Sequence, residues 1–110
     1  MLKFTFPTRD RLDEMTREER MNLFRQYFAT SRYNRLYIQQ CLVGSVIDDS
    51  LGLKVEDLER RHTKDFSFTL NLMSKYNYKD ELLFAAKEEY EALQKIMEAY
   101  NKRFKHQNSA

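Results

Sequence analysis

The sequence predicts an all-α protein, a compact bundle of four to five helices with a short extended N-terminal arm. The chain of 110 residues holds only 2 glycines and 1 proline, whereas an average protein has roughly 7% and 5%. Turns are therefore few, which argues against a β-sandwich or a Rossmann-type fold. Hydrophobic residues make up 42% of the chain and recur mostly at helical spacing, so one buried core is expected.

The N-terminal segment, residues 1–7, is predicted to be an arm or a short strand. Leu2, Phe4 and Phe6 alternate with polar residues, which is a strand-like period of two, and Pro7 ends the pattern. The polar stretch 8–14 is compatible with a helical turn. A single helical domain over residues 8–105 then follows the arm, and residues 106–110 are expected to fray.

The middle of the chain is predicted to contain several shorter helices. Thr16 and Glu19 match a capping box that opens a helix ending near residues 29–30. Ser31 is predicted to cap a second helix that runs to Ile47, with a buried apolar surface over residues 38–47. Gly52 is the expected stop signal of this region. A short helix over residues 55–62 and a helix over 64–76, capped by Thr63, are expected to follow before a break at 77–78.

The last helix has the clearest periodicity in the sequence. Its apolar residues are spaced alternately three and four apart, which is the pattern of a heptad seam. The seam residues are Leu83, Ala86, Tyr90, Leu93, Met97, Tyr100 and Phe104. We expect this seam to pack on the chain's own helices, and a homodimer through the 83–104 helix is the alternative.

Residue patterns that support catalysis or metal binding are absent from the sequence. Cys41, His62 and His106 are far apart, so they do not form a metal-ligand motif. A glycine-rich phosphate loop and a nucleophile elbow are also missing. We therefore expect neither an enzyme nor a metal or other cofactor. A single cysteine and the lack of a long apolar run predict a cytoplasmic protein with no membrane partner.

The most unusual feature is a block of arginines and aromatic residues. Seven of the ten arginines lie between Arg9 and Arg35, whereas eight of the nine lysines lie at or after Lys54. Arginine and aromatic residues are enriched at protein interfaces. The alternative is that the rings form the core and the arginines cover them. The candidate partner-binding residues are Arg20, Phe24, Arg25, Tyr27, Arg32, Tyr33, Arg35 and Tyr37.

These observations predict a small non-enzymatic interaction module, an adaptor, inhibitor or regulator that docks a protein partner. Within the arginine–aromatic block, Arg25, Arg32 and Arg35 are the members expected to be exposed. The alternative function is a nucleic-acid-binding regulator with a helix-turn-helix-like hairpin around Gly52 and a basic end at 102–105. The net charge of +2 and the acidic residues at 56, 57 and 59 favour the protein partner, because phosphates repel carboxylates.

Overall fold

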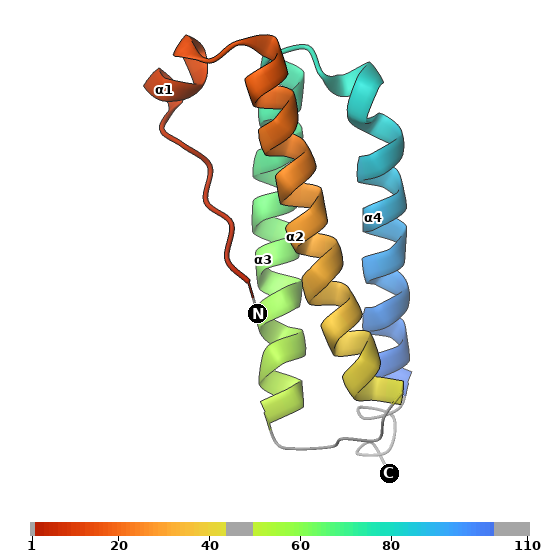
Figure 1. Cartoon of the computed structure of the whole chain (residues 1–110). Coiled ribbons are helices and arrows are strands. Elements are labelled where there is room, and N and C mark those ends of the chain that lie inside the picture. The colour runs from red at the N-terminus through yellow and green to blue at the C-terminus, as the bar shows by residue number, and fades with distance from the viewer. Residues whose placement is uncertain (1, 44–49, 103–110) are drawn as a thin grey trace.

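The computed structural model describes residues 2–43 and 50–102, and the all-α prediction is confirmed there. Its helices are α1 (Arg9–Glu14), α2 (Arg17–Val43), α3 (Ser50–Lys75) and α4 (Lys79–Tyr100). Figure 1 shows α2, α3 and α4 as a bundle in which α3 runs opposite to the other two, with α1 at the end where α2 begins. The molecule measures 53 × 22 × 20 Å, so the long helices set its shape.

The predicted start of α2 is confirmed by its cap. The Glu19 amide donates to the Thr16 hydroxyl at 3.2 Å, and the Thr16 amide donates to the Glu19 carboxylate at 3.1 Å. This reciprocal pair satisfies amide groups that the first turn of a helix leaves free. The bond from the Thr16 amide lowers the pKa of the Glu19 carboxyl, because the bond favours the charged form.

The predicted break near residues 29–31 is wrong, because α2 continues through it to Val43. Ser31 was expected to cap a new helix. Its hydroxyl instead donates to the Glu89 carboxylate of α4 at 3.0 Å. A serine is compatible with the interior of a helix when its side chain has a partner on a neighbouring element.

Two predicted helix boundaries within α3 are also wrong. Gly52 was expected to stop a helix and Thr63 to start one, yet both lie inside the continuous helix Ser50–Lys75. Glycine weakens a helix interior by only about 1 kcal/mol, which the packing of a helix of 26 residues offsets. The connection between α2 and α3, residues 44–49, and the predicted fraying tail both lie outside the described residues.

The predicted break at residues 77–78 is confirmed. Asn77 adopts a left-handed conformation with φ of 62°, and the chain turns there from α3 into α4. Asparagine tolerates this region better than other residues with a side chain, apart from aspartate. The Tyr78 amide then donates to the carbonyl of Met73 at 2.8 Å, which closes the end of α3.

We expect Asn77→Val to destabilise the protein by about 1–2 kcal/mol, because a β-branched residue disfavours positive φ. Asn77→Gly is expected to be close to neutral, since glycine adopts this conformation freely. Urea denaturation of both variants checks this. Equal stability of the valine variant and the wild type would show that the turn conformation is not a constraint.

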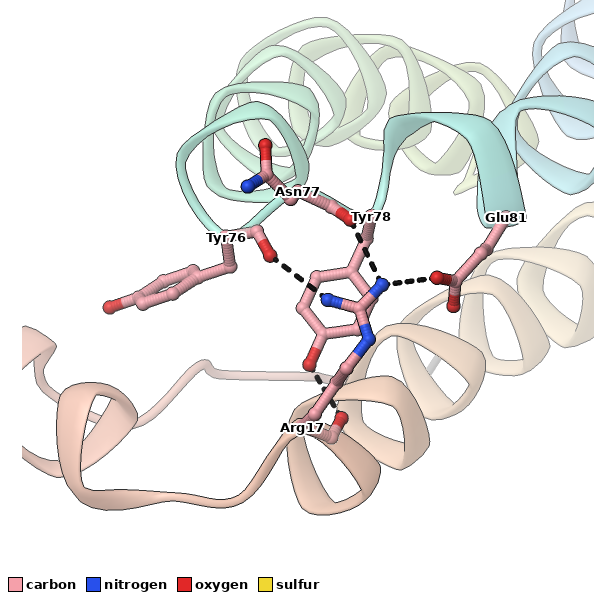
Figure 2. A network of polar contacts seen from close by, with 5 residues as sticks. All are labelled: Arg17, Tyr76, Asn77, Tyr78 and Glu81. Atoms are coloured by element: carbon pink, nitrogen blue, oxygen red, sulfur yellow. Dashed lines mark hydrogen bonds and ion pairs between the residues drawn. The ribbon is translucent and has the colours of Figure 1, made fainter.

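The α3–α4 turn is also held to the start of α2 by a polar network (Figure 2). The Arg17 guanidinium donates to the carbonyl oxygens of Tyr76 at 3.4 Å and Asn77 at 3.0 Å, and it pairs with Glu81. The buried Tyr78 ring lies against the same guanidinium, and its hydroxyl donates to the Arg17 carbonyl at 2.5 Å. One arginine therefore joins three segments of the fold.

The core consists of two clusters along the bundle. The cluster nearer α1 contains Phe24 and Tyr27 of α2, and the arm residues Phe4 and Phe6 pack against it. The second cluster lies near the other end of α2 and includes Ile38 and Leu93. Both clusters draw on α2, α3 and α4, so the three long helices are packed together at two levels of the bundle.

The predicted seam of the last helix is partly wrong. Ala86 and Leu93 are buried as expected, but Leu83 and Tyr90 are 49% and 45% exposed. The buried row differs from the predicted seam by one residue at three positions, and it includes a charged residue. Phe104 of the predicted seam lies outside the described residues. The buried residues of α4 are Leu82, Ala86, Glu89, Leu93 and Ile96.

None of the helices in the described ranges combines the length and the apolarity that crossing a membrane requires.

Candidate interaction surface

The eight predicted partner-binding residues all lie on α2, and the structure divides them into an inward and an outward group. Phe24 and Tyr27 are only 1% and 7% exposed. Both rings belong to the core cluster and contact the arm, with centroid distances of 5.8 Å from Phe6, so neither ring lies on the protein surface. Burial raises the pKa of the Tyr27 hydroxyl well above its usual range.

Two of the arginines are also used inside the protein. The Arg20 guanidinium lies over the Tyr76 ring at 4.4 Å and donates to the Leu12 carbonyl at 3.1 Å. Arg35 was expected to be exposed, but its side chain is only 15% exposed and pairs with Glu89 of α4. These arginines therefore stabilise the fold. The expected exposure of Arg35 is wrong, whereas partner contact by either arginine stays a prediction.

The outward group consists of Arg25, Arg32, Tyr33 and Tyr37, all of which are exposed. Arg25 and Arg32 have no ion-pair partner among residues 2–43 and 50–102. They are seven residues apart, so they lie on the same side of α2 two turns from each other. Tyr33, at 55% exposed, follows Arg32 directly. Tyr37 lies farther toward α3, where the Lys54 ammonium is 5.3 Å from its ring.

An open groove of about 610 Å³ lies between α2 and α4. Three of the predicted residues, Arg32, Tyr33 and Arg35, line it. We call this surface the α2/α4 groove. Its lining residues are Phe28, Ala29, Arg32, Tyr33, Arg35, Leu36, Ala85, Glu88 and Glu89.

The groove has an ion pair at its base that the sequence analysis did not find. Glu89 is 5% exposed, and both of its oxygens accept hydrogen bonds from Arg35, from Nε and Nη2 at 3.0 Å. Ser31 donates to the same carboxylate. Every oxygen of Glu89 therefore has a partner, which fixes the spacing of α2 and α4 at this level. The only sequence signal was a charged residue within the apolar row of α4.

The α2/α4 groove is lined by both apolar and charged side chains. Its apolar residues are Phe28, Leu36 and two alanines, and its rim carries Arg32 on α2 and Glu88 on α4. Within the described ranges no three histidine, cysteine, aspartate or glutamate residues are grouped closely enough to hold a metal ion.

Comparisons with protein-family models, curated proteins and solved structures find no match to this chain. The function proposed below therefore depends on the side chains of the α2/α4 groove.

Proposed function

We propose that the protein is a small non-enzymatic interaction module that docks a protein partner at the α2/α4 groove. One observation carries this proposal. Arg25 and Arg32 are exposed and unpaired within the described part of the chain, whereas Arg17, Arg20 and Arg35 are used internally. Arg32 lines the groove together with the exposed side chains of Tyr33 and Leu36, and interface centres are enriched in arginine and aromatic residues.

The partner that fits this surface is a helix with an apolar stripe and carboxylates on one flank. Tyr33 and Leu36 are 55% and 40% exposed, and they give such a helix two apolar contacts next to the groove. Arg32 then pairs with a partner carboxylate through two parallel hydrogen bonds. Three long helices with a groove between two of them also accept a fourth helix as in a four-helix bundle.

The proposal predicts that the double variant Arg25→Glu and Arg32→Glu loses partner binding but stays folded. Exposed charges contribute about 0–1 kcal/mol each to stability, whereas charge reversal adds repulsion at the interface. Affinity capture from an extract of the encoding organism, with quantitative mass spectrometry, identifies proteins retained by the wild type. Binding of the purified partner to each variant then measures the loss directly.

A matched control keeps the charge change the same and moves it away from the groove. Lys79→Glu with Lys87→Glu reverses two exposed lysines of α4 that do not line the groove. We expect this control to bind the partner as the wild type does. Equal binding by the wild type and the arginine double variant would refute the proposed surface.

Nucleic-acid binding, the alternative function, is distinguished by its salt dependence. Gly52, the predicted turn residue of the hairpin, is itself helical. Two arginine–phosphate contacts give a logarithmic salt slope of only about −2. Fluorescence anisotropy with labelled duplex DNA at two salt concentrations measures this slope. A steeper slope would favour nucleic acid as the ligand, because it requires phosphate contacts from further basic residues.

A further inference from the structure

A second groove, between α2 and α3, is filled by the chain's own N-terminal arm. Figure 1 shows this arm running beside the bundle toward α1. The Phe6 ring is 5.8 Å from the rings of Phe24 and Tyr27 on α2 and 5.9 Å from that of Phe68 on α3. The Phe4 ring is 5.9 Å from Tyr27. The two arm phenylalanines therefore occupy an aromatic site made by both helices.

The main chain of the arm is held by a single buried side chain. The Leu2 amide donates to Oδ1 of Asn34 at 2.9 Å, and Nδ2 of Asn34 donates to the Leu2 carbonyl at 3.0 Å. Asn34 is only 6% exposed. Its amide thus binds both polar backbone groups of one residue, so it recognises extended main chain whatever the side chain is.

The arm does not fill the groove completely. Cavities of about 170 and 330 Å³ lie along it, and Tyr27 and Asp65 line both. Asp65 is the only acidic residue among the lining residues, and Lys3 of the arm is the only basic one. The site therefore offers a backbone clamp, two aromatic positions two residues apart and one carboxylate.

From these features we propose that the α2/α3 groove is a peptide-binding site that the N-terminal arm occupies in competition with a partner. The partner is an extended segment of another protein with a basic residue followed by two aromatic residues that have one residue between them. The segment from Lys3 to Phe6 has this pattern. Its position in the α2/α3 groove shows that a segment with this pattern fits there. This site is separate from the α2/α4 groove, and neither exposed arginine of the proposed function lines it.

The test uses the full chain with a weakened arm, Phe4→Ser and Phe6→Ser, and a fluorescent N-acetylated peptide of residues 2–8. The acetyl group keeps the Leu2 amide as a hydrogen-bond donor. We expect the double variant to bind the peptide about tenfold more tightly than the wild type does, because a tethered arm competes at millimolar effective concentration. Fluorescence anisotropy measures both affinities.

Two controls distinguish specific recognition of the peptide from non-specific binding. Adding Asn34→Ala to the weakened-arm variant is expected to reduce peptide affinity about tenfold, since the backbone loses both partners. A peptide with serine at both aromatic positions is expected not to bind. The proposal would be overturned if the weakened-arm variant folds but does not bind the peptide of residues 2–8. It would also be overturned if this variant binds the serine peptide as tightly as the peptide of residues 2–8.

A second design covers the case in which the weakened-arm variant does not fold. A specific protease site inserted between Pro7 and Thr8 allows the arm to be cut after folding. We expect native mass spectrometry to detect the cut arm still bound, and added peptide to replace it. Immediate loss of the arm with no uptake of peptide would refute the site. Wild-type dimers that disappear in the weakened-arm variant would instead assign the groove to the arm of a second copy.

Discussion

Glu89→Ala is expected to destabilise the protein by about 3–5 kcal/mol, because it removes one member of a buried ion pair. The Arg35 side chain is 15% exposed and binds Glu89 through Nε and Nη2. Without the carboxylate, the largely buried guanidinium loses its ion-pair partner. Ser31 also loses the acceptor of its hydroxyl. Urea denaturation followed by circular dichroism measures the difference.

The neighbouring carboxylate provides the control for this prediction. Glu88 lies on the exposed rim of the α2/α4 groove, so we expect Glu88→Ala to change stability by less than about 0.5 kcal/mol. Replacing both Glu89 and Arg35 with methionine is expected to recover most of the loss, since apolar residues of similar volume replace a buried pair well. A Glu89→Ala variant as stable as Glu88→Ala would show that the pair does not hold α2 and α4 together.

Leu93→Ala is expected to cost about 2–5 kcal/mol, the usual range for a buried leucine that leaves a cavity. Leu93 is fully buried and belongs to the cluster that joins α4 to Ile38 and Leu42 of α2. Leu83→Ala is the matched control on the same helix, because Leu83 is 49% exposed. We expect that variant to lose less than half as much stability.

Equilibrium unfolding of Leu93→Ala at two protein concentrations separates core packing from a dimer contact. A core residue gives the same unfolding free energy at both concentrations, whereas a dimer contact makes it depend on concentration. A folded, monomeric Leu93→Ala variant with wild-type stability would mean that the seam of α4 is an intermolecular contact.

The local sequence by itself determined the helical class and several element ends. Few glycines, one proline and helical spacing of apolar residues are enough to predict helices. Thr16 with Glu19 marked the start of α2, and Asn77 lay at the break before α4. These signals are local, since a cap or a left-handed residue acts on backbone groups within a few positions of itself.

The tertiary structure alone decided which helices are continuous. Ser31, Gly52 and Thr63 each looked like a helix boundary, and all three lie inside long helices. Their local preferences amount to at most about 1 kcal/mol each. The free energy gained by packing bundle helices of 22–27 residues exceeds these local preferences. The helices therefore continue through all three residues.

The tertiary structure also decided which members of the arginine–aromatic block face solvent. The sequence located the block but divided it between two predicted helices, whereas the structure places residues 20–37 on the single helix α2, which points them to different sides. Arg35 points inward because Glu89 lies opposite it on α4, 54 residues away, whereas Arg25 and Arg32 have no such partner in the described ranges. Asn34 likewise gained its role from the arm, 32 residues before it. Such pairings depend on how separate elements meet in space, and no spacing within one element encodes them.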